Sequence, residues 1–365
     1  MLKLFEVKGF KNFEKKVTLD FSDIRDYKFN RECIKDNLLN TIIIYGKNGI
    51  GKSNFGLAIF DIVTHLTNKN ISPNLYDYYI NSNTSSNEVE FRYIFQFGLD
   101  EVEYIYKKNN ERNIVYERLI INSKELMEYD YIEKKGNVDE LQKLSPTLNW
   151  KYLDSESLIK YFINNSSIDN ENPLSLLMRF VSDMLWFRSL DENRYIGYKT
   201  KSNDYFNFIS EPKVLNELKE FLNRACIDED LIMKKDNDGI ERLYFNTKTP
   251  LPFFKVASSG TKALYTFFYW YKTATNISFL YIDEFDSFYH HELAELLVEL
   301  LEKNQKFQTI LTSHNTNLLS NKIMRPDSYF ILSKNKITSL SNATTRELRE
   351  GHNLEKLFVN GEFDE

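Results

Sequence analysis

Eight consecutive residues, Gly46-Lys47-Asn48-Gly49-Ile50-Gly51-Lys52-Ser53, constrain the fold of this chain more than any others. The run before them, at positions 39 to 46, is rich in β-branched residues and predicts a strand covered on both faces. Positions 53 to 66 carry apolar side chains at helical spacing. The whole chain has only 12 glycines, so three within six residues require a local cause. A tight loop between a buried strand and a helix provides that cause.

The spacing G-x-x-x-x-G-K-S between a strand and a helix is that of a P-loop. Glycines allow backbone N–H groups to turn inward around phosphates, and the helix N-terminus adds partial positive charge. Lys52 is expected to reach the β- and γ-phosphates, and the Ser53 hydroxyl to coordinate Mg²⁺. The nucleotide-binding candidates in this loop are Asn48, Gly49, Gly51, Lys52, Ser53 and Asn54.

A second apolar run, positions 279 to 282, ends in the adjacent carboxylates Asp283 and Glu284. In an α/β sheet, ligands bind outside the carboxyl ends of the strands, which is the edge that carries the P-loop. Asp283 is therefore predicted to hold Mg²⁺. Glu284 is predicted to act as the general base or to position the attacking water.

Two further runs flank this strand. The segment from Val256 to Leu264 contains Ser258, Ser259 and Gly260, which by themselves predict only a helix N-cap. Thr312-Ser313-His314-Asn315 ends the strand that follows Asp283 in the chain. His314 is therefore expected at the same sheet edge, within reach of the γ-phosphate.

The remaining patterns predict an α/β fold. Residues 2 to 21 indicate an antiparallel β-hairpin, and three alternating runs between 87 and 122 indicate an antiparallel meander. Helical spacing is strongest at 175–187 and 214–225, in a polar middle segment. Strands then alternate with helices, which predicts a parallel sheet. The expected division is 1–122 and 251–365 for the two parts of a nucleotide-binding head, with a helical insertion or lid at 123–250.

Composition limits the possible partners. The 365 residues include 47 basic and 53 acidic side chains, a formal net charge of −6, so no global positive field attracts nucleic acid or an anionic membrane. The basic pairs at 107–108, 134–135 and 234–235 are interpreted as solvated faces. No apolar run approaches the roughly 20 residues of a membrane helix. Together with the absence of a disulfide or zinc framework in two cysteines, this predicts a cytoplasmic protein.

The order of P-loop, S-S-G-T-K run, apolar strand with Asp-Glu, and strand-terminal Thr-Ser-His resembles the ABC-type ATPases of the SMC, Rad50 and RecF kind. The resemblance is closest to the stand-alone bacterial AAA15/AAA21 or OLD-like ATPases. It extends to Phe10-Lys11-Asn12-Phe13 and to the tail from Leu348 to Phe363. It covers roughly the first 120 and last 115 residues. The implied fold is an ABC-ATPase head with a mixed P-loop sheet, an antiparallel β subdomain and a helical insertion.

The resemblance implies Mg²⁺-dependent ATP hydrolysis by a head-to-tail dimer or higher oligomer. Ser258, Ser259 and Gly260 of one copy are then expected to close on the nucleotide of the other. Asp286 is expected in the loop after the Asp-Glu pair, and His314 as the switch histidine. Gln96 is the candidate for a glutamine contact to the metal. The relatives include ATPase components of anti-phage systems of the PARIS and Septu kinds, so a separate effector, such as a TOPRIM or HNH nuclease, is the expected partner.

Alternative functions stay open at this point. One is a DNA-repair ATPase of the RecF kind that clamps DNA directly. Another is an ATPase fused to a HEPN-like RNase through Arg346 and His352, which fit the R-x₄₋₆-H pattern. A third is a nucleotide-bound scaffold that does not hydrolyse ATP. The adjacent His290 and His291 suggest a metal site less strongly than a solvated role, since neighbouring side chains on one helix point in different directions.

Overall fold

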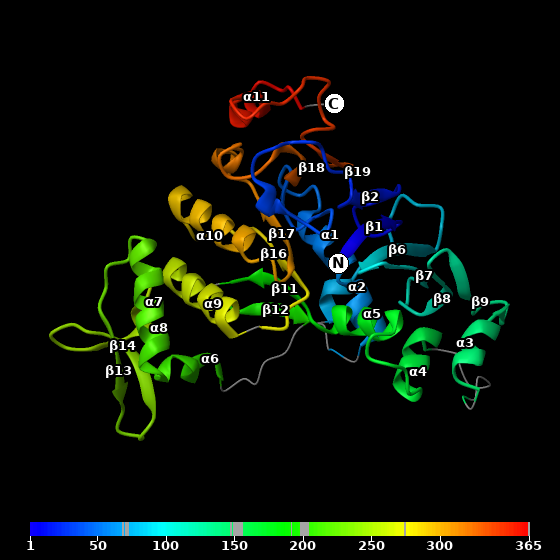
Figure 1. Cartoon of the computed structure of the whole chain (residues 1–365). Helices are drawn as coiled ribbons and strands as arrows, with labels where there is room; N and C mark the ends of the chain where they lie inside the picture. The colour runs from blue at the N-terminus through cyan, green and yellow to red at the C-terminus, as the bar shows by residue number, and fades with distance from the viewer. Residues whose placement is uncertain are drawn as a thin grey trace.

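The computed structural model describes residues 1–67, 69, 73–146, 148, 156–190, 192–197, 204–273 and 275–363. In this part of the chain two seven-stranded sheets lie on either side of helices α1 (Lys52–Ile59) and α2 (Asp61–Leu66) (Figure 1). The buried side chains of both helices join both sheets in one apolar core. The helix that follows the P-loop is therefore clamped between the two layers.

The central sheet carries the predicted phosphate-binding edge. Its strand order is β12-β11-β16-β17-β5-β18-β19. The five strands from β11 to β18 are parallel, whereas β12 and β19 pair antiparallel at the two edges. The strands are β5 (Thr41–Tyr45), β11 (Met184–Ser189), β12 (Arg194–Gly197), β16 (Phe279–Ile282), β17 (Gln308–Ser313), β18 (Tyr329–Ser333) and β19 (Lys336–Ser339). The parallel sheet predicted from alternating strands and helices is confirmed.

The faces of the central sheet are covered by different elements. Ile42 and Ile44 of β5 belong to the core shared with α1 and α2, whereas Ile43 and Tyr45 belong to a second core. That second core includes side chains of α9 (Ser259–Thr273) and α10 (His291–Lys303). Full burial of β5 explains its continuous β-branched sequence.

The other large sheet is antiparallel and forms a β subdomain, drawn in blue to cyan and green in Figure 1. Its strand order is β10-β9-β8-β7-β6-β1-β2. The strands are β1 (Leu2–Lys8), β2 (Val17–Asp20), β6 (Glu88–Phe97), β7 (Asp100–Asn109), β8 (Ile114–Ile121), β9 (Lys124–Asp130) and β10 (Lys135–Asn137). The predicted hairpin and meander are both confirmed and belong to the same sheet.

The middle segment contains helices but also contributes strands to both large sheets. Its helices are α3 (Asp139–Leu144), α4 (Leu158–Asn165), α5 (Pro173–Ser182), α6 (Asp204–Asn207) and α7 (Pro212–Arg224). The prediction of helix over 175–187 is wrong beyond Ser182, because Met184–Phe187 pairs with β16 and is buried on both faces. A short apolar run fits a helix and a buried strand equally well by periodicity. The domain boundaries at 122 and 250 stay a prediction.

A small lobe lies at the far side of α9 from the β subdomain (Figure 1). It consists of α7 with the three-stranded sheet β13-β14-β15 and α8 (Phe253–Val256), which leads directly into α9. Its strands are β13 (Leu231–Lys235), β14 (Glu241–Phe245) and β15 (Leu251–Pro252). Outside this lobe, the described helices and strands also include the hairpin of β3 (Ile34–Lys35) and β4 (Leu38–Leu39) and the C-terminal α11 (Leu354–Val359). None of the helices in the described part of the chain has both the length and the apolar character needed to span a bilayer.

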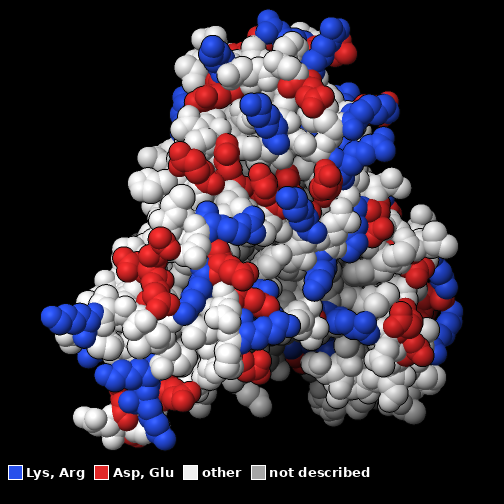
Figure 2. All heavy atoms as spheres, turned by 60° about the vertical axis from the view of Figure 1, so that its left-hand side comes forward, with Lys and Arg blue, Asp and Glu red and all other residues white. Residues whose placement is uncertain are grey.

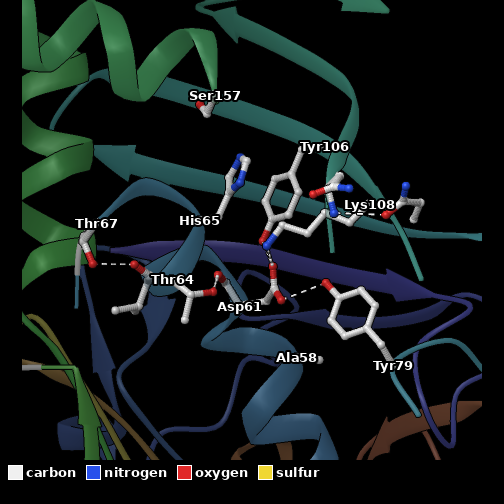
Figure 3. A network of polar contacts seen from close by, with 12 residues as sticks. Ala58, Asp61, Thr64, His65, Thr67, Tyr79, Tyr106, Lys108 and Ser157 are labelled. Carbon is white, nitrogen blue, oxygen red and sulfur yellow. Dashed lines mark hydrogen bonds and ion pairs between the residues drawn. The ribbon is translucent and has the colours of Figure 1, made fainter. Parts of the chain in front are cut away.

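A buried carboxylate fastens α2 to the antiparallel sheet (Figure 3). Asp61 accepts hydrogen bonds from the hydroxyls of Tyr79 and Tyr106 at 2.8 and 2.9 Å and pairs with the ammonium of Lys108. Asp61 and Lys108 are both buried. His65, one turn along α2, stacks on the Tyr106 ring with centroids 4.0 Å apart. The interpretation of Lys108 as a solvated charge is therefore wrong: strand alternation exposes Lys107 and buries Lys108.

We predict that Lys108→Met lowers the free energy of unfolding by about 3 kcal/mol, because it leaves the buried Asp61 carboxylate without its cation. Lys107→Met is the matched control. Its ammonium is part-exposed beside Glu88 and Glu90, so its loss is expected to cost less than about 1 kcal/mol. Urea unfolding measures both values, and equal destabilisation by the two variants would contradict this account.

A second buried carboxyl group lies on α10. Glu302 accepts a hydrogen bond from the Cys33 thiol at 3.1 Å, and burial raises its pKa from 4.5 to about 8. Because the carboxyl group binds its proton more tightly in the folded chain, the folded state holds more protons between these two pH values. The contribution of Glu302 to stability is therefore largest at low pH and is lost as the pH rises through that window.

Glu302→Gln is expected to flatten the pH dependence of unfolding between pH 4.5 and 8, and to stabilise the chain at the upper end by about 3 kcal/mol. Glu299→Gln provides the control, since Glu299 is exposed on the same helix. Urea titrations across this pH range provide the measurement. Parallel pH slopes for wild type and Glu302→Gln would show that the buried carboxyl group does not set this dependence.

Candidate active site

The loop between β5 and α1 adopts backbone conformations that require glycine. Gly49 and Gly51 have φ angles of +76° and +112°, in the left-handed region. A Cβ added at Gly51 would lie 3.0 Å from the side chain of Asn12. Asn12 belongs to the turn between β1 and β2 and donates to the Gly49 carbonyl at 3.4 Å. Asn54 in turn donates to Asn12, so the first hairpin supports the P-loop from outside.

The N-terminus of α1 is fixed over the end of β16. The hydroxyl of Tyr281 donates to the Lys52 carbonyl at 2.9 Å. The Ser53 side chain hydrogen-bonds the Asp283 carboxylate, which directly follows the end of β16. These contacts bring the P-loop lysine and serine to the carboxylate that the sequence assigned to Mg²⁺.

Lys52 connects three segments of the chain. Its ammonium donates to the Gly46 carbonyl at 2.8 Å and contacts Nε2 of His314 at 2.8 Å. The same Nε2 lies 3.5 Å from Oε1 of Glu284. Burial lowers the pKa of Lys52, and the carboxylates of Glu284, Asp283 and Asp286 oppose that shift. His314 thus lies between the predicted Lys52 and Glu284 and contacts both.

Thr312 contacts both residues of the Asp-Glu pair. Its hydroxyl donates to Oδ1 of Asp283 and accepts from the backbone N–H of Glu284, each at 2.7 Å. Glu284 has a φ of +47°, a left-handed conformation that is uncommon for a residue with a side chain. Burial raises the pKa of Asp283, and the hydrogen bonds from Ser53 and Thr312 counteract this rise. The Glu284 side chain is about half-exposed and free to contact a ligand.

The loop after Glu284 is anchored in a similar way. Asp286 accepts from the Ser313 hydroxyl at 2.6 Å, and the N–H of Asn315 donates to the same hydroxyl. Burial raises the pKa of Asp286. A Cβ at Gly260 would lie 2.6 Å from the Phe288 carbonyl, so α9 and this loop approach closely.

The predicted signature residues begin α9. The Ser258 hydroxyl accepts from the N–H of Thr261 at 3.1 Å, which makes it the expected helix cap. Ser258 and Ser259 are exposed. Their described hydrogen bonds are to α9 and connect them to no residue of the P-loop in the same chain.

Gln96 lies in a different place from the one predicted. Its amide group donates to the carbonyls of Gly98 and Asp100, in the turn between β6 and β7. No described contact links it to Ser53 or Asp283. The prediction failed because an alternating strand sequence does not show which of its polar side chains serves its own hairpin.

The two alternative sites gain no support. Arg346 lies near Glu362, whereas Nδ1 of His352 accepts from the backbone of Arg349, in a segment without described helix. His291 pairs with Glu295 along α10. Among the described residues, no group of three or more His, Cys, Asp or Glu side chains is arranged to bind a metal.

Three residues that shape the site were not assigned a role from the sequence. Asn12 supports the P-loop, Tyr281 fixes α1, and Thr312 orients the Asp283 carboxylate and holds the Glu284 backbone. Asn12 and Thr312 lie inside recognised motifs, so only their roles were missing. Beside the P-loop, a hollow of about 850 Å³ opens between His314, β18 and α11.

Residues 42–320 match a family model described as "AAA domain, putative AbiEii toxin, Type IV TA system". The chain belongs to this family. The predicted resemblance to the AAA21 group of P-loop ATPases is confirmed by this match, which spans the P-loop, the signature, the Asp-Glu pair and His314. No curated protein matches the sequence closely enough to count as a relative.

Solved structures of SMC heads are similar in outline. An SMC head bound to the C-terminal winged-helix domain of ScpA is 17% identical, with a TM-score of 0.48 over 93% of this chain and 97% of the other. The SMC head domain from Thermotoga maritima is 15% identical, with a TM-score of 0.46 over 93% and 98%. At this level of similarity neither structure assigns a function.

We predict that Lys52→Ala weakens ATP binding by roughly 100-fold, because it removes a charge-assisted contact to phosphate. Lys47→Ala is the control, since Lys47 is exposed on the same loop. It is expected to change affinity by less than about threefold. Equilibrium titration with a fluorescent ATP analogue measures both. An unchanged affinity for Lys52→Ala would place the nucleotide elsewhere.

Proposed function

We propose that this protein hydrolyses ATP with Mg²⁺ in a head-to-tail dimer, and that the ATP cycle acts as a switch in anti-phage defence. The observation that carries the proposal is the convergence of Lys52, Ser53, Asp283, Glu284 and His314 at one sheet edge. These side chains combine a cation for phosphate, oxygen ligands for a divalent ion and a carboxylate for a water molecule.

Ser53 and Asp283 suit Mg²⁺, which commonly takes one or two protein oxygens together with substrate phosphates. Their side chains already hydrogen-bond each other beside the P-loop, and Thr312 orients the Asp283 carboxylate. When bound, the ion would neutralise charge on the β- and γ-phosphates. Gln96 is not part of this proposed set.

The chain's own residues have distinct proposed roles. Lys52 binds the β- and γ-phosphates. Its ammonium must give up its contacts with Gly46 and His314 to do so. Glu284 accepts the proton of the attacking water through its half-exposed carboxylate. His314, next to both, binds the γ-phosphate. Asn48, Gly49, Gly51 and Asn54 shape the loop, whose N–H groups face the phosphates.

A second copy would complete the site. Ser258 and Ser259 are exposed at the start of α9. Because α9 is fifteen residues long, its N-terminus carries partial positive charge that favours an anion. Their separation from the P-loop of the same chain leaves them available for the γ-phosphate held by another copy. Gly260 and Asp286 lie at the adjoining contact between α9 and the loop after Glu284. Binding of ATP would then join two copies, and hydrolysis would release them.

The biological role rests on the family. Its description names a toxin of a type IV toxin–antitoxin system, a context in which an ATPase is expected to control a toxic activity. We propose that a separately encoded effector, such as a nuclease, is held or activated by the ATP-bound dimer. Charge supports a protein partner over a DNA clamp: on the face in Figure 2, basic and acidic side chains are interspersed, and the net charge is −6.

Glu284→Gln tests the switch. It removes the proton acceptor and keeps the shape, so ATP turnover is expected to fall by about 100-fold or more while ATP still binds. The variant should form a stable dimer with ATP and dissociate with ADP, as measured by light scattering after size exclusion. Glu292→Gln, on the exposed first turn of α10, should resemble wild type. A Glu284→Gln chain that stays monomeric with ATP would refute the dimer.

A further inference from the structure

Strand β11 ends beside the Asp-Glu pair. It runs parallel to β16, with Phe187 in register with Ile282. The ladder continues by one more bond, because the N–H of Asp283 donates to the Phe187 carbonyl at 3.0 Å. The next residue of β11 is Arg188. It therefore lies at the same sheet edge as Asp283, one strand spacing away, about 5 Å.

The two faces of β11 and β16 lie against different cores. Trp186 and Tyr281, in register on β11 and β16, contact each other in the core that includes α1, with ring centroids 6.0 Å apart. Phe187 packs on the opposite face against Trp270 of α9. Arg188 lies at an irregularity of β11, so alternation alone does not fix the direction of its side chain. Its backbone is one strand away from Asp283, and the Asp283 carboxylate acts on its charge. Tyr281, on the α1 face of β16, also holds the Lys52 carbonyl.

Arg188 is also the extra residue of a β-bulge. In the β11–β12 hairpin, Phe187 pairs with Tyr195 and Ser189 pairs with Arg194, which leaves Arg188 without an opposite residue. Bulges of this kind redirect a side chain and are common next to active sites. The neighbouring arginine does not share this position, because Arg194 pairs with Glu192 on the outer strand.

The guanidinium of Arg188 has no hydrogen bond or ion pair with any residue in the described ranges. Partial desolvation and Arg194 lower its pKa, and the Asp283 carboxylate is close enough to oppose that shift. Asp283 is itself engaged by Ser53 and Thr312. Arg188 is an exposed residue, so a permanently charged side chain with five donors and no protein partner in the described ranges is accessible to a ligand at the edge where phosphates are expected.

We propose that Arg188 binds the terminal phosphate of the nucleoside triphosphate, together with Lys52, and so makes the site prefer ATP to ADP. This inference rests on the proposed function. The terminal phosphate is favoured over the inner ones because Arg188 approaches from the Asp283 and Glu284 side, away from the P-loop on β5. Arg188 thereby occupies the position beside Asp283 for which the sequence suggested Gln96.

The experiment compares ATP and ADP affinity in the full chain carrying Glu284→Gln, which stops turnover. Calorimetric titrations are made with Mg²⁺ and again with EDTA. Arg188→Ala is expected to weaken ATP by about tenfold or more and ADP by less than about threefold, in both conditions. Arg188→Lys should recover part of the ATP affinity. Arg194→Ala, in the same hairpin, is the control and should bind both nucleotides normally.

Each result decides the matter. Thermal unfolding shows whether each variant is folded. If Arg188→Ala does not fold, the affinities of Arg188→Lys for ATP and ADP provide the test. Selective loss of ATP affinity supports the proposal. Equal loss of ATP and ADP affinity, or no loss, overturns it, with Lys52→Ala as the reference for a weakened site. If the parent chain binds neither nucleotide, the proposed function fails first, and this inference falls with it.

Discussion

The candidate site depends on the in-register pairing of parallel strands in the central sheet. β5, β17 and β16 are hydrogen-bonded neighbours, and their carboxyl ends meet at one edge. This pairing brings Lys52 into contact with His314, 262 positions away in the sequence. No local segment contains this constellation. A shift of one residue in any of these strands would turn its functional side chain to the other face.

The second constraint is the position of α1 between two layers. At its start, Tyr281 and Asp283 hold Lys52 and Ser53. Beyond its end, Asp61 ties the following helix to the antiparallel sheet through buried tyrosines and Lys108. Contacts with both sheets would therefore hold Lys52 in place when phosphates bind to it. In physical terms, the β subdomain is a rigid support for the P-loop.

Sequence reasoning located the parts of the site that short motifs encode. The P-loop, the Asp-Glu pair and His314 were predictable because each follows a sequence typical of a buried strand and consists of residues with a specific chemistry. Gln96 and Lys108 were misjudged for another reason. Their environments depend on which strands pair and which face of the sheet is covered. The local sequence pattern predicts neither of these. Arg188 was overlooked since the apolar residues before it fit a helix as well as a strand. Its position follows only from pairing with β16.

The central claim is that each nucleotide is shared between Lys52 of one copy and Ser258 of another. Mixing two inactive variants tests it most directly: Lys52→Ala, which loses its own P-loop cation, and Ser258→Arg, which blocks the partner's site. A mixed dimer retains one intact composite site. The account predicts that the mixture recovers ATP turnover to about one quarter of wild type, because random pairing makes half the dimers mixed, each with one of two sites. A mixture that stays inactive, or a Ser258→Arg chain that is fully active alone, would contradict it.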